Sequence, residues 1–149
     1  MALIIGLDPG PEQTGMVWLD DGTVSHPGVH QNKTVLRMLY HALGEVACEM
    51  IASYGMPVGR DVFETCVWIG RFLGAASAAG HAFHRLTRLE VKLHLCQSAR
   101  AKDTNIRQAL IDRYGPVGTK KTPGPLYGVT SHAWAALAVA TTHADRQRP

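Results

Sequence analysis

The chain has 149 residues, the length of one domain, and should bury about two thirds of the surface that its unfolded form exposes. Hydrophobic residues make up 46% and charged residues 18%, a balance that excludes an intrinsically disordered chain. No apolar run is long enough to cross a membrane, and the N-terminus lacks a secretory signal pattern, so we expect a cytoplasmic protein. The three cysteines are odd in number and lack metal-site spacing, which indicates free thiols.

The formal net charge of +3 is distributed unevenly along the chain. Residues 1–70 hold three basic and eight acidic residues, a net charge of −5. Residues 71–149 hold twelve basic and four acidic residues, a net charge of +8. A protein that binds a polyanion and also carries acidic metal ligands would show such a split, and ordinary surface variation is the alternative.

The chain begins with three predicted strands. An apolar run over residues 3–7, followed by Asp8, Pro9 and Gly10, predicts a buried strand that ends in a turn. Residues 15–19 predict a second strand, and Asp-Asp-Gly after it is a hairpin signal before a short third strand at 23–25. Together they predict an antiparallel meander.

A long helix and a fourth strand are predicted next. The helix is expected over residues 33–54 and should end at Gly55 and Pro57, because apolar residues recur at helical spacing: Leu36, Leu39, Leu43, Val46 and Met50. Residues 61–65 predict the fourth strand, and a crossover through the helix would make this strand parallel to the first.

The second half of the chain predicts one further strand, four helices and a loop. The strand is expected over residues 85–90. The helices are expected at residues 70–82, 91–96, 104–114 (capped by Asp103) and 131–145, with a mobile loop rich in Gly and Pro at 115–128. This order predicts a single α/β domain over residues 1–149, with a mixed five-stranded sheet flanked by helices.

Three side chains are candidates for a metal site. Asp8 ends the first strand, Glu64 lies on a strand predicted to be its neighbour, and His132 opens the last helix. Two carboxylates at adjacent strand ends repel each other unless a cation lies between them, and oxygen ligands suit Mg²⁺ or Mn²⁺. His132 would bind the metal or act as a general base. The alternatives are a turn aspartate at Asp8, a solvent-facing glutamate at Glu64 and a histidine bonded to backbone at His132.

Four motifs now occur in order: Ile5-Gly6-Leu7-Asp8-Pro9-Gly10 with Thr14-Gly15, then Phe63-Glu64, then Val91-Lys92, then the run Ser131–Ala140. Together they resemble the RuvC family of Holliday-junction resolvases in the RNase H-like superfamily, over nearly the whole chain. The resemblance implies an RNase H-like nuclease that uses two divalent ions per site and cuts branched DNA, leaving a 5′-phosphate. It also implies a homodimer, because a four-way junction needs two symmetric nicks.

One position departs from the pattern of this family. Its last helix usually carries a second metal-facing side chain, an aspartate, three residues after the first. Here that position is Ala135, which cannot bind a metal. Asp145 lies about 20 Å farther along the helix and cannot replace it, so Glu12, in the turn after Asp8, is the more plausible substitute. A branched-DNA-binding protein that lost full metal binding at Ala135 is the alternative function.

Basic residues in the second half fit a DNA-binding role. Lys92 would contact the scissile phosphate or stabilise charge on the leaving group, unless it is a solvated helix lysine. A cluster of basic residues would neutralise flanking phosphates: Arg100, Lys102, Arg107, Lys120 and Lys121.

A sugar-kinase-like protein is a further alternative, because such proteins also begin with a strand, an acidic residue and glycine. This chain is too short for the two lobes of such an enzyme.

Overall fold

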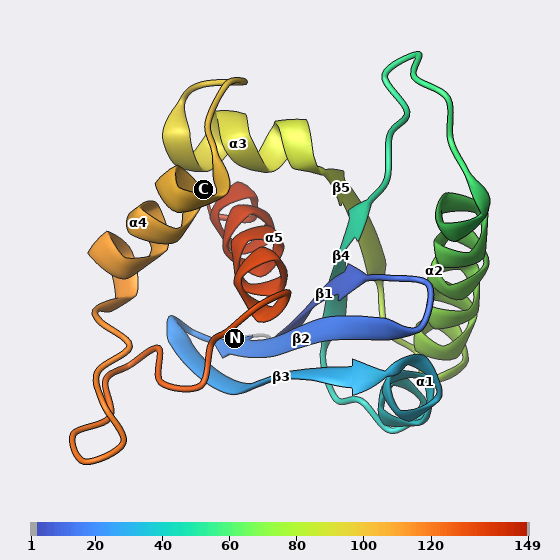
Figure 1. Ribbon diagram of the computed structural model, residues 1–149. Coiled ribbons are helices and arrows are strands. Elements are labelled where there is room, and N and C mark those ends of the chain that lie inside the picture. Colours follow the sequence, from blue (N-terminus) through green and yellow to red (C-terminus); the bar gives the residue numbers. More distant parts are fainter. Residues whose placement is uncertain (1–2, 149) are drawn as a thin grey trace.

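The computed structural model describes residues 3–148 and shows a five-stranded mixed sheet with helices on both faces (Figure 1). The strands lie in the order β3-β2-β1-β4-β5 and are β1 (Leu3–Pro9), β2 (Gln13–Asp20), β3 (Thr23–Gln31), β4 (Glu45–Met50) and β5 (Phe83–Thr87). The helices are α1 (Asn32–Tyr40), α2 (Arg60–Ala78), α3 (Arg88–Cys96), α4 (Asp103–Tyr114) and α5 (Ala133–Arg146). The predicted fold class is confirmed. In residues 3–148, no helix combines the length and apolar character needed to cross a bilayer.

The predicted antiparallel meander is confirmed, with longer strands than expected. β1 pairs with β2 from Leu3 opposite Asp20, and β2 pairs with β3. Asp21 and Gly22 connect β2 to β3 with φ values of 49° and 83°. Positive φ at both central residues is what a two-residue hairpin turn of type I′ requires, and Asp-Gly suits it.

The long helix predicted over residues 33–54 is wrong. α1 ends at Tyr40, and β4 follows after a short connection. Leu43, counted in the helical pattern, is 87% exposed, whereas Val46 is fully buried in the sheet. The apparent helical spacing combined apolar residues of α1 with residues of β4. Because β4 is buried on both faces, its apolar residues do not alternate with polar ones, and they show no strand period that would identify it. β4 is parallel to β1, so the predicted crossover exists but is made by other residues.

The strand predicted over residues 61–65 is also wrong, because this segment forms the first turns of α2. The buried side chains of α2 include Thr65, Ile69, Phe72 and Ala76, and this spacing matches one face of a helix. A segment of five residues is too short to distinguish the two-residue period of a strand from the period of about 3.6 residues of a helix. The helix predicted at 70–82 is the second half of α2.

Two smaller corrections concern the second half of the chain. β5 ends at Thr87 and α3 begins directly after it, because Thr87 and Glu90 form a reciprocal capping box at this point. Asp103 is the first residue of α4 and Lys102 precedes it at the N-cap, so Asp103 is not the predicted cap. α5 is confirmed close to its expected bounds.

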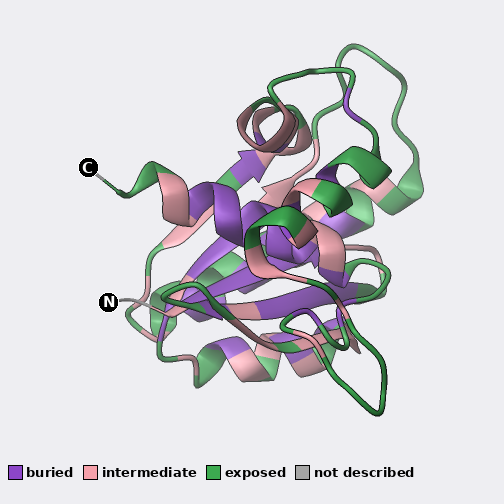
Figure 2. Ribbon diagram, turned by 90° about the vertical axis from the view of Figure 1, so that its left-hand side faces the viewer, coloured by how far each residue is buried: buried purple, intermediate pink, exposed green. Residues whose placement is uncertain are grey.

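Two apolar cores lie on the two faces of the sheet, and buried residues form its centre in Figure 2. Alternate residues of a strand point to opposite faces. Ile5 and Leu7 of β1 therefore pack toward α1 and α2, whereas Ile4 packs toward α3, α4 and α5. Gly6 lies on the same face as Ile4, and a Cβ there would collide with the backbone of Ala136 in α5. This close approach places the start of α5 over the end of β1.

Candidate active site

Two carboxylates meet at the ends of neighbouring strands. β1 and β4 are parallel, with Leu7 opposite Cys48, so Asp8 and Glu49 are the next residues along the two strands. Both are one residue beyond a side chain that packs toward α2, so both point to the face covered by α5. They line a cavity of about 500 Å³ together with residues of α3, α4 and α5.

The electrostatics of this pair fit a cation site. The pKa of Glu49 is raised to about 8, first by burial of its carboxyl group and second by the charge of Asp8 and a hydrogen bond with Asp8. Asp8 itself is only 9% exposed. At neutral pH Glu49 therefore holds a proton, and a divalent cation bound between the two carboxyl groups would replace that proton. Oxygen ligands of this kind suit Mg²⁺ or Mn²⁺.

His132 lies just before α5 and is bonded to Asp8. Its Nδ1 is 2.9 Å from Oδ2 of Asp8. With Asp8 ionised, this bond requires a proton on Nδ1, which leaves Nε2 of a neutral imidazole free to accept a proton. The His132 side chain is 68% exposed, so water reaches it.

Arginine side chains complete the electrostatics of the cavity. Arg88, the first residue of α3, donates from Nη1 to Oε1 of Glu49 at 3.3 Å and also pairs with Asp103 of α4. Arg107 of α4 lines the cavity too, with its guanidinium 5.3 Å from the ring centroid of Trp134. Arg88 and Arg107 therefore place fixed positive charge beside two acids, where an anionic phosphate would approach.

Ala135 also lines this cavity, in the first turn of α5 and three residues after His132. Positions three apart on a helix share a face. The methyl group of Ala135 thus lies where a longer acidic side chain would reach the same space as Asp8 and Glu49.

The structure brings together only some of the predicted site residues. Asp8, His132 and Arg107 line the cavity. Among residues 3–148, Glu64, Glu12 and Lys92 are not part of its lining. Glu64 is exposed on α2, because the strand that would have carried it is a helix, and Glu12 is exposed in the turn between β1 and β2. Lys92 is half-buried on α3, one turn beyond Arg88.

Glu49 and Arg88 are the residues that sequence reasoning missed. A usable signal existed for Glu49, because Val46-Ala47-Cys48-Glu49 repeats the pattern of an apolar run that ends in an acid, as at Asp8. The long helix predicted across this segment concealed it. Arg88 had no comparable signal, since it was assigned to a strand.

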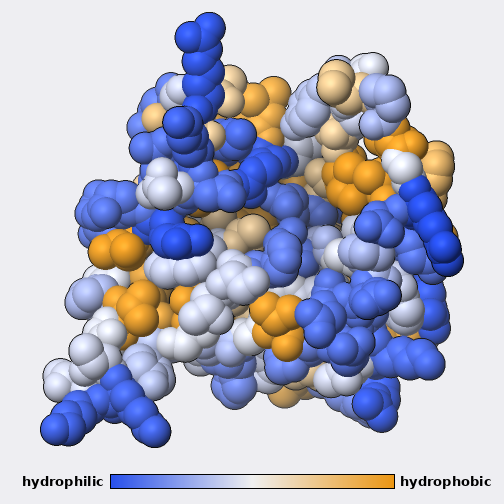
Figure 3. Space-filling model, in the orientation of Figure 1, coloured by the Kyte–Doolittle hydropathy of each residue, from blue (hydrophilic) through white to orange (hydrophobic). Residues whose placement is uncertain are grey.

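The other predicted DNA contacts are exposed basic residues on the side of α4. Arg100 and Lys102 lie in the connection between α3 and α4, and Lys120 and Lys121 lie in the loop between α4 and α5. This loop extends away from the body in Figure 1, and its tip is strongly hydrophilic at the lower left of Figure 3. An isolated bridge between Gly118 and Pro123 closes the tip.

The raised pKa of Glu49 gives a testable dependence of stability on pH. Between about pH 4.5 and 8 the metal-free native state holds a proton on Glu49 that the unfolded state has lost, so this group destabilises the fold as pH rises. We expect Glu49→Gln to raise the free energy of unfolding by about 4 kcal/mol at pH 8 and by less than about 1 kcal/mol at pH 5.

Urea unfolding with a chelator at both pH values measures this difference. Glu64→Gln is the matched control, because Glu64 is exposed and should change stability little at either pH. Equal effects of Glu49→Gln at pH 5 and pH 8 would contradict the assignment.

Comparison with known proteins gives a fold relationship. No protein-family model matches the sequence, and no curated protein matches it. A solved structure of Thermus thermophilus RuvC is 22% identical with a TM-score of 0.74, over 95% of this chain and 93% of that one. T. thermophilus RuvC in complex with a Holliday junction substrate is 22% identical with a TM-score of 0.69, over 97% of this chain and 93% of that one. The chain therefore has the fold of the RuvC structures.

Proposed function

We propose that this chain is a divalent-metal-dependent endodeoxyribonuclease that hydrolyses phosphodiesters in branched DNA and resolves four-way junctions by paired nicks. The observation that carries this proposal is the pair of carboxylates at the ends of β1 and β4, with the pKa of Glu49 raised to about 8 beside Asp8. The fold supports it, since a RuvC structure of the same fold holds a Holliday junction substrate.

Asp8 and Glu49 would hold the metal in this function. Bound there, a divalent ion acts as a Lewis acid that activates water and offsets negative charge on the phosphate. His132 is bonded to Asp8 through Nδ1 and would take a proton from the attacking water through Nε2. Because the His132 ring is a potential ligand as well, a site that recruits its imidazole nitrogen would favour Mn²⁺ over Mg²⁺.

The basic side chains would position the DNA. Arg88 is bonded to Glu49 and lies in the cavity, so it replaces Lys92 as the candidate contact to the scissile phosphate. Arg107 lies beside it, and the exposed residues Arg100 and Lys102 extend the positive charge outward, with Lys120 and Lys121 farther along. These residues would contact phosphates independently of sequence, and binding should therefore weaken as salt rises.

A homodimer would let two such sites act on one junction. An apolar surface suited to a second copy lies on α2 and the loop before it, where Phe63 is 62% exposed, Val67 57% and Met56 69%. Figure 3 shows hydrophobic side chains gathered in this region, at the upper right. Exposed apolar side chains in one area are typical of a protein interface.

Nicking of a synthetic four-way junction tests the proposal. With Mg²⁺ or Mn²⁺ we expect paired nicks in strands of like polarity that leave 5′-phosphates, and no cleavage with a chelator. Asp8→Asn should abolish cleavage while junction binding, measured by gel shift, persists. Cleavage that survives in Asp8→Asn would contradict the proposed site.

Ala135 favours a second candidate function, a branched-DNA-binding protein with weak or no catalysis. Its methyl group lines the cavity where a further acidic ligand would face the metal. The same assay separates the two functions, because tight junction binding without cleavage under either metal supports the binding protein.

A further inference from the structure

We propose that Glu45, His84 and His143 form a second metal site, for a borderline transition-metal ion of the Zn²⁺ class. In residues 3–148 this is the one group in which three metal-ligating side chains bring their ligand atoms within 4.8 Å of one another. The site does not depend on the proposed nuclease function. It uses none of the residues that line the cavity at Asp8.

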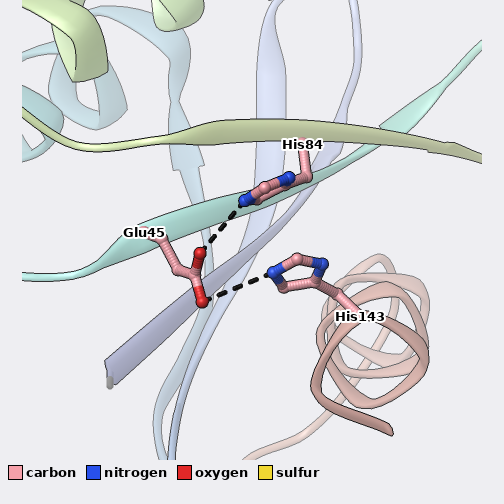
Figure 4. A group of neighbouring side chains, drawn as sticks. All are labelled: Glu45, His84 and His143. Atoms are coloured by element: carbon pink, nitrogen blue, oxygen red, sulfur yellow. Dashed lines mark hydrogen bonds and ion pairs between the residues drawn. The ribbon is translucent and has the colours of Figure 1, made fainter. Parts of the chain in front are cut away.

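Three separate elements supply these side chains (Figure 4). Glu45 is the first residue of β4, and Ala47, two residues later, lies on the same face of the sheet. His84 of β5 is the pairing partner of Ala47, so His84 lies on that face as well. His143 lies in the last turn of α5, which covers that face. The group therefore lies at the end of the sheet opposite Glu49. His143 is eleven residues beyond His132, or about 16 Å along the helix axis.

The distances fit one ion between the three groups. Nε2 of His84 is 3.0 Å from Oε2 of Glu45, and Nε2 of His143 is 3.4 Å from Oε1. Ligand atoms of a tetrahedral zinc site lie about 3.3 Å apart when each is about 2 Å from the ion. The two imidazole rings are stacked, with centroids 4.1 Å apart, and both direct Nε2 at the carboxylate.

His143 supplies an independent observation in favour of a ligand. Its side chain is only 8% exposed, and its buried Nε2 makes no well-formed hydrogen bond, since it has only the ion-pair contact of 3.4 Å with Oε1 of Glu45. An unpaired buried polar atom is costly, and native structures rarely leave one unexplained. An ion bound at Nε2 would satisfy this atom directly.

The donor set selects the class of metal. Two imidazoles and one carboxylate suit Zn²⁺ and neighbouring transition metals, whereas Mg²⁺ prefers an all-oxygen shell. Three protein ligands leave a fourth position for water. His84 and His143 both line a cavity of about 530 Å³, so the two imidazoles border a space that can hold water. Arg146 also lines this cavity, but its guanidinium is paired with Glu90 at 2.7 Å.

A bound ion would join β4, β5 and the end of α5, because each contributes one ligand. It would bind the native state and not the unfolded chain, and therefore raise the unfolding temperature in a Zn²⁺-dependent manner. This effect should appear without DNA and with the Asp8 site disabled.

Zn²⁺ titration by calorimetry in the Asp8→Asn background, with excess Mg²⁺ present, tests the proposal. We expect one Zn²⁺ per chain. His84→Asn and His143→Gln should each weaken the Zn²⁺ affinity by more than about 100-fold, since loss of an outer-shell partner alone lowers metal affinity by about 10–100-fold. His41→Asn removes an exposed histidine outside the group and should leave the affinity unchanged.

Co²⁺ provides a second readout, because four-coordinate Co²⁺ absorbs strongly in the visible range. That absorption should be present in the His41→Asn control and absent in His84→Asn, whose half-exposed side chain makes it the variant least disruptive to folding. Zn²⁺ affinity equal in His84→Asn and in the control would overturn the proposal, and so would the absence of any Zn²⁺ binding stronger than that of Mg²⁺.

Discussion

Glu49→Gln is expected to lower the rate of junction nicking by more than about 100-fold, whereas Glu64→Gln should leave it unchanged. The lower bound is the largest loss usually seen when only an outer-shell partner of a ligand is removed. Glu49 shares the cavity with Asp8, and burial together with the charge of Asp8 raises the pKa of Glu49, while Glu64 is exposed on α2. The two variants thus distinguish the proposed site at Asp8 and Glu49 from the site that the sequence predicted at Asp8 and Glu64.

Single-turnover nicking with saturating protein measures the chemical step in both variants, and junction binding is measured separately. Glutamine keeps the size of glutamate, so a loss in Glu49→Gln reports the missing charge. The cleavage defect should be partly relieved at higher Mn²⁺ concentration, because a weakened ligand set still binds metal at high occupancy. Full activity in Glu49→Gln together with loss in Glu64→Gln would refute the assignment.

The sequence predicted β1 and its carboxylate well because both signals were local. Five apolar residues followed by Asp-Pro-Gly fit a buried strand and a turn, and few other structures satisfy both. His132 was predicted for a similar reason, since it follows a loop rich in Gly and Pro and precedes a run of small apolar residues, and the structure places it beside Asp8. The position of Asp8 beside His132 then follows from Gly6, which lets α5 lie against β1.

Glu49 was not predicted because its strand has no period of its own. Val46, Ala47 and Cys48 are all fully buried, so β4 shows no alternation, and its residues fell by chance at helical distances from Leu36 and Leu39. As a consequence, the fourth strand was predicted at residues 61–65, which belong to α2, and Glu64 was predicted as the second acidic ligand. Pairing between β1 and β4 is a long-range property, and a single sequence gives no direct measure of it.

The group at Glu45 could not be predicted from sequence at all. His84 and His143 lie 39 and 98 positions beyond Glu45, and none of the three occurs in a ligand motif. They meet because β5 pairs with β4 and because α5 crosses the same face of the sheet. At the other end of the sheet, β4 carries Glu49, and His132 lies directly before the first residue of α5. One strand and one helix therefore place an acid and a histidine together at each end of the sheet.

Ala135→Asp is expected to tighten Mg²⁺ binding by about tenfold or more, which corresponds to about 1.4 kcal/mol, and to raise the nicking rate at limiting Mg²⁺. The substituted carboxylate would project into the cavity from the first turn of α5, on the face shared with His132. It adds an anionic oxygen ligand to a site that holds Asp8 and Glu49, and such ligands raise affinity for a hard divalent cation. In the absence of metal the added charge should destabilise the fold, and Mg²⁺ should restore the stability.

Ala135→Asn is the matched control for this change, because it has nearly the same shape as the aspartate variant without its charge. Metal titrations by calorimetry and nicking rates across a range of Mg²⁺ concentrations measure both variants against the natural sequence. If Ala135→Asp alone gains affinity and rate, the missing carboxylate limits the site. If the natural sequence binds junctions without cutting them and Ala135→Asp cuts them, the chain is the branched-DNA-binding protein. Equal Mg²⁺ affinity and equal nicking rates in the two variants would show that a side chain at position 135 does not face the metal.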